Sequence, residues 1–220
     1  MDWDSVSLSL QLAFISTFFL LGLALPLAFW FALHRSYLTT ILEALCFLPL
    51  LLPPTVMGFY LLLFMNPKTY IGRAWSAIFG QNLVFNFSGL VVGSVICSLP
   101  LVLKPIQNAF ERVDKKYVEM AASCGHPPFA IFRKIYWPLS LPAILAAAIL
   151  GFAHTLSEFG IVLMLGGNIP GKTRTISIAI YDAVESSNYA AAHRLSILML
   201  GFSFCILCLI YREYVGGPKR

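Results

Sequence analysis

LSLQLAFISTFFLLGLALPLAFWFAL, residues 8–33, contains no Asp, Glu, Lys or Arg. A bilayer core needs about 20 apolar residues per helix, so this stretch predicts a membrane-spanning helix. The whole chain agrees, because 59% of its 220 residues are hydrophobic and only 11% are charged. A soluble domain has about 25% charged residues, and this chain has too little polar material to cover the surface of a soluble enzyme. The sequence therefore predicts an all-α integral membrane protein.

Four further stretches are apolar over a usable length. They are residues 44–65, 83–103, 139–165 and 195–211. The third of these is interrupted by Glu158, and the last is short but usable. We therefore expect one transmembrane domain over residues 1–220, with five helices in the lipid bilayer.

The distribution of Lys and Arg between these spans indicates how the chain is oriented. If the N-terminus lies outside, the inner segments hold ten basic residues and the outer segments hold five. Three of the ten are Arg212, Lys219 and Arg220, near the C-terminus. Because basic residues concentrate in cytoplasmic loops, we expect the N-terminus outside and the C-terminus in the cytoplasm. The net charge of +5 then reflects these loops, and we expect no nucleic-acid partner.

The longest inner segment, residues 104–138, has the pattern of two short helices. VDKKYVEMAASCG (113–125) ends in a glycine where a helix would stop, and PPFAIFRKIYWP (127–138) starts at prolines and ends at another. We call this predicted pair, with its sharp turn near Gly125, the elbow. A bulky residue at Gly125 is expected to clash within the turn. The elbow would present an apolar surface to the bundle and to a docked partner, formed by Phe129, Phe132, Tyr136 and Trp137.

Two groups of residues inside the spans are candidates for a transport pathway or a gate. Pro53 and Pro54 predict a broken or kinked helix, because each proline removes a backbone hydrogen bond. His154 and Glu158 share one helix face, and a carboxylate at the centre of a span costs about 2.5–3.5 kcal/mol. A purely structural kink, and a paired Glu158 near the outer interface, are the alternatives.

Residues 166–173, Gly-x-x-x-x-Gly-Lys-Thr, match the phosphate-binding loop of nucleotide-hydrolysing enzymes. That loop works between a buried strand and a helix, whereas this segment follows an apolar span on the expected outer side. Pro170 also removes one amide donor. The histidines and cysteines lack the spacing of a zinc site. We therefore expect no catalytic residue, no metal and no cofactor bound by this chain.

The elbow contains a motif with known relatives. Glu119, Ala121 and Gly125 are followed, after nine residues, by Ile135 and Pro138. This pattern resembles the EAA loop of ABC importer permeases, Glu-Ala-Ala, three residues, Gly, nine residues, Ile-x-Leu-Pro. The sequence departs from it where Met120 replaces Ala and Trp137 replaces Leu. Both replacements keep an apolar side chain.

Three further segments are similar to those of oxyanion permeases. LPLLLPPTVMG (48–58) and SEFG (157–160) resemble segments of that family. GNIPGKT (167–173), with Ala-Ile-Tyr (179–181) and Glu185 after it, looks most like the molybdate permeases. The alternatives of similar chemistry are tungstate and sulfate permeases.

The resemblance implies an assembly and a set of roles. The chain would adopt the type I ABC importer permease fold and form a homodimer in the cell inner membrane. Two cytosolic ABC ATPase subunits, which use ATP and Mg²⁺, would bind the elbow, and an extracytoplasmic molybdate-binding protein would deliver the anion. ATPase coupling would belong to Glu119, Ala121, Ala122, Gly125, Ile135 and Pro138. Contacts to the binding protein or the anion are expected of the outer-loop residues Asn168, Lys172, Thr173 and Arg174, with packing of that loop as the alternative.

An ion-coupled secondary anion carrier is the less favoured mechanism. Such a carrier needs titratable groups spread through the bundle, and the spans offer only His154 and Glu158, with Glu43 near an inner boundary. Import of a dianion against an inside-negative potential costs roughly 4.6 kcal/mol per 100 mV. The sequence therefore favours a permease driven by a partner ATPase over an enzyme or a carrier.

Overall fold

The computed structural model describes residues 2–216, with side chains described for residues 2–208. Lys219, Arg220 and the side chain of Arg212 lie outside this part, as do the last side chains of the predicted span 195–211. The described chain is helical and contains no strand. In chain order its helices are α1 (Trp3–Leu33), α2 (Tyr37–Leu51), α3 (Pro54–Phe64), α4 (Tyr70–Phe79), α5 (Phe87–Glu111), α6 (Lys115–Ser123), α7 (Pro128–Ile131), the π-helix η1 (Phe132–Tyr136), α8 (Trp137–Ser157), α9 (Gly160–Gly166), α10 (Ile176–Glu185) and α11 (Tyr189–Gly216).

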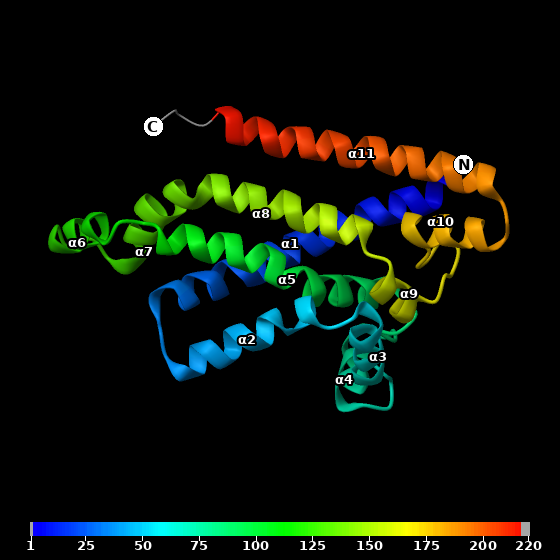
Figure 1. The fold of residues 1–220 in the computed structure, drawn as a ribbon. Coiled ribbons are helices and arrows are strands. Elements are labelled where there is room, and N and C mark those ends of the chain that lie inside the picture. The colour runs from blue at the N-terminus through cyan, green and yellow to red at the C-terminus, as the bar shows by residue number, and fades with distance from the viewer. Residues whose placement is uncertain (1, 217–220) are drawn as a thin grey trace.

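Helices α1, α5 and α8 pack against one another and form the centre of the bundle (Figure 1). Leu20, Ala24 and Ala28 are fully buried and recur every four residues, so they share one face of α1. The small side chains of Ala24 and Ala28 let α5 approach closely. On α8, a Cβ atom added to Gly151 would lie 2.6 Å from Val102 Cγ2 of α5, so glycine is needed at this crossing. Helix α11 lies outside this core and contacts α8 and α10.

Four helical segments of the described chain are long and apolar enough to cross a membrane. They are Trp3–Leu33, Phe87–Glu111, Pro128–Ser157 and Tyr189–Cys208. A fifth crossing is possible if α2 and α3 count as one broken span, since they are bent by 116°. The structure therefore has four to five candidate spans, as the hydropathy of the sequence predicts.

The predicted span boundaries differ from the helices in several places, and α1, α2 and α11 each begin five to seven residues before the predicted boundary. The predicted span 44–65 is two helices, because Pro53 and Pro54 break it. The predicted span 139–165 is also two helices, since α8 ends at Ser157 and α9 begins at Gly160. Helix α5 continues to Glu111, eight residues beyond the predicted boundary at 103. Short helices α4 and α10 lie in segments where the sequence predicted none.

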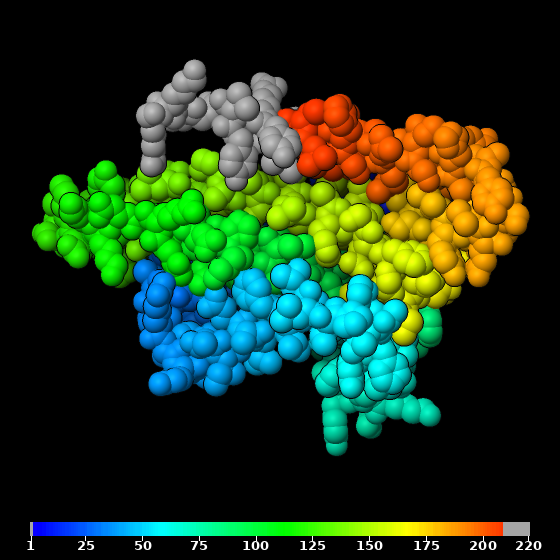
Figure 2. All heavy atoms as spheres, viewed as in Figure 1, coloured from blue at the N-terminus to red at the C-terminus, as the bar shows by residue number. Residues whose placement is uncertain are grey.

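The bundle has two distinct ends (Figure 1). Helices α6 and α7 project at one end, together with the link between α1 and α2. The N-terminus, α9, α10 and the α3–α4 pair lie toward the other. We refer to these as the elbow end and the far end. The space-filling view shows α6 and α7 as a protrusion beyond the main bundle (Figure 2).

Candidate functional site

The turn between the two elbow helices forms where the sequence predicts it. Helix α6 starts after Asp114, whose side chain accepts a hydrogen bond from the Lys116 amide at 3.0 Å. At its end the Gly125 amide donates to the Ala122 carbonyl and the His126 amide donates to the Ala121 carbonyl. This pair of bonds closes a helix with a left-handed residue, and Gly125 has a φ of +78°.

Gly125 is required for its backbone conformation and not, as expected, for lack of space in the turn. A Cβ atom added to Gly125 meets nothing within 4 Å, so the predicted clash within the turn is wrong. What disfavours other residues here is the positive φ, which brings the Cβ of an L-residue close to the following carbonyl oxygen. The open space also means that the outer side of the turn is free to contact a partner.

The predicted coupling residues divide into two groups. Glu119, Ala122 and Gly125 are exposed on α6 and its turn, and no residue of α6 is buried. Ala121 and Ile135 are partly buried and pack against the central apolar core. Pro138 is exposed in the first turn of α8. Glu119, Ala122, Gly125 and Pro138 are thus exposed, whereas Ala121 and Ile135 attach the elbow to the bundle.

The second elbow helix does not end at Pro138, as the sequence predicts, but runs through a π-turn into α8. The Trp137 amide donates to the Phe132 carbonyl, five residues earlier. Pro138 lacks an amide proton, and in an α-helix its ring would clash with the carbonyl of the residue four positions earlier. The wider π-turn relieves this clash. The second elbow helix and α8 therefore form one continuous helical segment, Pro128–Ser157, which is long and apolar enough to cross a membrane.

The four aromatic residues of the predicted elbow surface are not all exposed. Phe129 is 74% exposed, and Trp137 is 37% exposed. Tyr136 is buried and Phe132 is partly buried, and both rings contact Phe29 of α1. Of the expected aromatic surface, the part formed by Phe132 and Tyr136 thus packs under the bundle, and Phe129 remains available on the outside.

His154 and Glu158 belong to a polar cluster between α5, α8 and α9. The Nδ1 atom of His154 is 2.9 Å from Ser98 Oγ, and its Nε2 atom is 3.9 Å from Glu158 Oε2. Ser98 Oγ also lies 3.3 Å from Thr155 Oγ1. The Glu158 carboxylate accepts a hydrogen bond from the Ile161 amide at 3.4 Å. Glu158 therefore connects the end of α8 to the first turn of α9, and His154 connects both to α5.

Ser98 is a member of this cluster that sequence reasoning missed. It is 99% buried in α5, and its neighbour one turn earlier, Ser94, is fully buried without a hydrogen-bond partner for its hydroxyl. Two serines four residues apart within an apolar span were the available signal. That signal does not identify a partner, because His154 lies 56 residues further along the chain.

The two groups of pathway candidates come together in the structure. Pro54 is the first residue of α3 and packs on the start of α9. A Cβ atom added to Gly160 would lie 2.9 Å from the Cβ of Pro54. Gly160 follows Glu158 by two residues, so the proline break and the α8–α9 break lie against each other. These two helix breaks thus lie together, next to the polar cluster.

Three of the outer-loop candidates form hydrogen bonds within the loop and to α10. Arg174 donates through Nε to Asn168 Oδ1 at 2.7 Å, and Asn168 donates to Asp182 of α10 at 3.1 Å. Thr173 is fully buried; its hydroxyl donates to the Gly166 carbonyl at 2.7 Å and accepts from the Ile169 amide at 3.0 Å. Packing therefore accounts for Asn168, Thr173 and Arg174.

Lys172 is the exposed member of this group. Helix α10 begins at Ile176 and not directly after the Gly-Lys-Thr tripeptide. In a phosphate-binding loop the hydroxyl at this position holds magnesium. The Thr173 hydroxyl instead bonds the Gly166 carbonyl and the Ile169 amide and so closes the loop. Among the described residues, no three His, Cys, Asp or Glu side chains are grouped so that they could hold a metal ion.

Replacing Thr173 with valine tests this closure. The change leaves the Gly166 carbonyl and the Ile169 amide without their partner, and an unsatisfied buried group such as the Gly166 carbonyl costs about 1–3 kcal/mol. We expect a lower thermal unfolding temperature of the purified protein in detergent. Lys172→Ala is the matched control, since that side chain is exposed, and it should leave the temperature unchanged. Equal temperatures for the two variants would contradict the closure.

Similar sequences and structures agree with this architecture. The chain is 47% identical to the molybdenum transport system permease protein ModB of Azotobacter vinelandii, over 98% of this chain and 96% of that protein. It is 30% identical to the sulfate transport system permease protein CysT of Escherichia coli K12, over 89% of this chain and 70% of that protein. Both relatives are transport permeases.

The fold has solved counterparts. The inward-facing MetNI methionine ABC transporter matches with a TM-score of 0.71 and 17% sequence identity, covering 97% of this chain and 96% of that one. The predicted all-α ABC importer permease fold is thereby confirmed. The family model of binding-protein-dependent transport system inner membrane components matches residues 24–212. This multi-pass membrane chain therefore belongs to the family of binding-protein-dependent transport system inner membrane components.

Proposed function

We propose that this chain is the permease subunit of an ATP-driven importer that moves molybdate across the cell inner membrane. The elbow carries the proposal, because it projects from the bundle and exposes Glu119 and the Gly125 turn where an ATPase can bind them. Molybdate is proposed as the cargo from the molybdenum transport relative at 47% identity. ATP hydrolysis is assigned to a separate subunit.

The proposed assembly places one partner at each end of the bundle. Two cytosolic ATPase subunits would bind the elbows of a permease homodimer, which puts the elbow end in the cytoplasm. A molybdate-binding protein would bind the far end, where Lys172 is exposed. This orientation agrees with the N-terminus outside, the C-terminus in the cytoplasm, and the excess of basic residues on the inner side.

The transport cycle follows from differential contacts in two states. Closure of the ATPases on ATP would draw the two elbows together and open the bundle toward the binding protein. Hydrolysis would release the elbows and return the bundle to an inward-open state. The breaks at Pro53–Pro54 and at Glu158–Gly160 are suited to this motion, because helix segments can change their angle at such interruptions.

The polar cluster is assigned to the wall of the pathway. An anion that passes through needs only transient hydrogen bonds from hydroxyl and amide groups, since a tight cationic site would retain it. The side chain of His154 is 32% exposed and that of Glu158 is 10% exposed. We infer that a second copy of the chain covers this face.

Uptake into proteoliposomes tests the proposal. The chain would be reconstituted with its ATPase and binding protein and supplied with labelled molybdate, with ATP enclosed or omitted, and with sulfate and tungstate as competitors. ATP-dependent molybdate uptake that excess sulfate does not suppress is the expected result. Uptake driven by an ion gradient without ATP would overturn the proposal and make Glu158 the first coupling residue to test.

Replacing Glu119 with lysine tests the ATPase contact. Glu119 is exposed on α6 and accepts the Ser123 hydroxyl only through its backbone carbonyl, so the change should leave the fold intact. We expect the amount of ATPase co-purifying with the permease to fall about tenfold, as reversal of a charge at an interface does. Glu185→Lys, at an exposed position of α10 at the far end, is the matched control. Unchanged co-purification of the Glu119 variant would contradict the assignment.

A further inference from the structure

Four aromatic rings from three elements of the chain meet where the elbow joins the bundle. Phe29 of α1 lies at their centre, with ring centroids 4.9 Å from Phe132, 5.1 Å from Tyr136 and 5.5 Å from Phe110 of α5. All three contacts are edge-to-face, with interplanar angles of 76–85°. This is the favourable geometry for aromatic pairs. We call these four residues the aromatic box.

The position of the box matters because α1 has no peptide connection to the elbow. The elbow is linked to α5 by residues 112–114 and to α8 through η1. A displacement of the elbow therefore reaches α5 and α8 through the chain itself. It can reach α1 only through side-chain contacts. Phe29 makes such contacts, with the ring of Phe110 on α5 and with the two rings of η1.

The π-turn aims two rings of the elbow at Phe29. Phe132 and Tyr136 are the first and last residues of η1, and both contact the same ring of α1. Single π-turns are rare inside α-helices and are frequent at functional sites. This one lies between the exposed part of the elbow and α8, so a change in its winding would displace the rings relative to α1.

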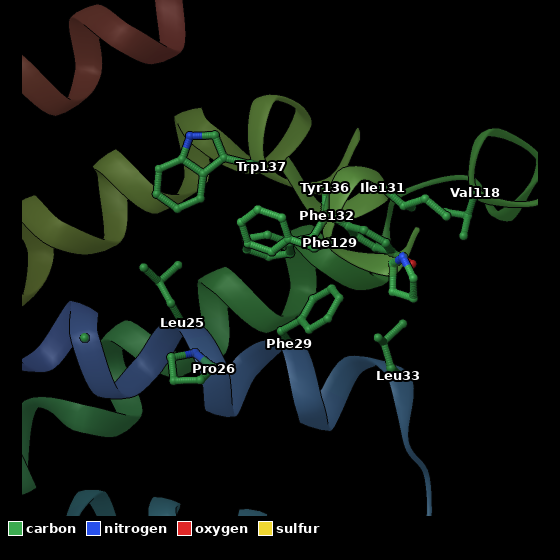
Figure 3. A pocket seen from close by; sticks show the side chains of 12 residues that line it. Leu25, Pro26, Phe29, Leu33, Val118, Phe129, Ile131, Phe132, Tyr136 and Trp137 are labelled. Atoms are coloured by element: carbon green, nitrogen blue, oxygen red, sulfur yellow. The ribbon is translucent and has the colours of Figure 1, made fainter. Parts of the chain in front are cut away.

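A hollow lies beside the aromatic box. It has a volume of about 790 Å³ and lies between α1 and the elbow (Figure 3). Leu25, Leu33 and Val118 line it together with rings of the box, and its walls are almost entirely apolar. The box therefore packs against Phe110 of α5 on one side and borders this apolar hollow on the other.

We propose that the aromatic box transmits the motion of the elbow to α1, so that Phe29, Phe132 and Tyr136 are positioning residues for coupling. The inference rests on the proposed function, because it needs an ATPase that moves the elbow. It predicts that loss of the Phe29 ring separates ATP hydrolysis from transport. A residue that serves stability alone would lower both activities in proportion.

The test compares variants of α1 in the reconstituted complex. The quantity measured is the ratio of molybdate imported to ATP hydrolysed. We expect this ratio to fall about tenfold in Phe29→Ala and about threefold in Phe29→Leu, which keeps an apolar side chain without the ring edges. Tyr136→Phe retains the ring and should keep the wild-type ratio. Phe18→Ala, on the same helix at a residue that is 75% exposed and outside the box, is the matched control.

The results distinguish failure of the proposed transport function from failure of the aromatic box. Wild-type complex without ATP-dependent uptake rejects the proposed function. Normal wild-type uptake with an unchanged ratio in Phe29→Leu rejects the aromatic box alone, as does an equal fall in the Phe18→Ala control. If Phe29→Ala fails to assemble with the ATPase, the ratio in Phe29→Leu decides.

Discussion

Replacing Gly125 with leucine is expected to reduce ATP-dependent uptake about tenfold while the protein still inserts into the membrane. The residue holds φ at +78°, and an L-residue pays about 1–2 kcal/mol in the left-handed region. The turn would then relax and shift the exposed part of α6 away from the ATPase, which is equivalent to about tenfold in affinity. Uptake by proteoliposomes and co-purification of the ATPase measure the two effects.

Two further glycine variants separate the causes. Asparagine tolerates the left-handed conformation, so Gly125→Asn should keep most of the uptake if backbone strain is responsible. Gly80→Leu has the same kind of positive φ, +66°, and equally open space, but lies after α4 at the far end. It should leave ATPase recruitment unchanged. A loss of recruitment in Gly80→Leu as large as in Gly125→Leu would show that the elbow turn has no special role.

Replacing Glu158 with leucine is expected to reduce uptake tenfold or more. The change removes the acceptor of the Ile161 amide at the start of α9 and the partner of His154 Nε2. The Ile161 amide then has no acceptor, and an unsatisfied buried donor typically costs about 1–3 kcal/mol, so the angle between α8 and α9 should no longer be held. Uptake should fall more than ATPase co-purification, since the elbow lies at the opposite end.

Glu158→Gln distinguishes positioning from charge. Glutamine keeps a carbonyl oxygen that can accept from the Ile161 amide, so uptake should recover substantially if Glu158 holds the helix break. Uptake that stays as low as in the leucine variant would assign the role to the charge instead. Glu185→Leu, an exposed glutamate on α10, is the control. Wild-type uptake in Glu158→Leu would remove this residue from the pathway.

Much of the architecture could be predicted because the determining interactions are local. Lipid allows only segments whose backbone groups are satisfied internally, so long apolar stretches such as residues 8–33 report helices directly. The turn at Gly125 was predictable for a similar reason, since one residue carries the conformational freedom that it needs. The elbow motif likewise depends on spacing along the chain, which the sequence shows.

Features that depend on pairs of distant residues could not be predicted in this way. The segment 139–165 is apolar on both sides of Glu158, so its composition favours one helix. Only the structure shows that the helix ends before Glu158 and that the next helix, α9, packs on Pro54. The outer-loop polar residues looked available for a partner because their composition is polar. In the structure most of them satisfy one another across residues 166–182.

The sequence by itself determined that this is a helical membrane protein, which stretches are apolar, and where the elbow turns, because hydropathy and backbone conformation are properties of short segments. Only the tertiary structure decided that Ser98 meets His154 and that Phe29 meets Phe132 and Tyr136. Those contacts join residues 56 or more positions apart, and they are selected by how the faces of α1, α5 and α8 fit together. Hydrophobic burial is non-directional, so it specifies that these faces are covered and leaves the choice of partner to packing.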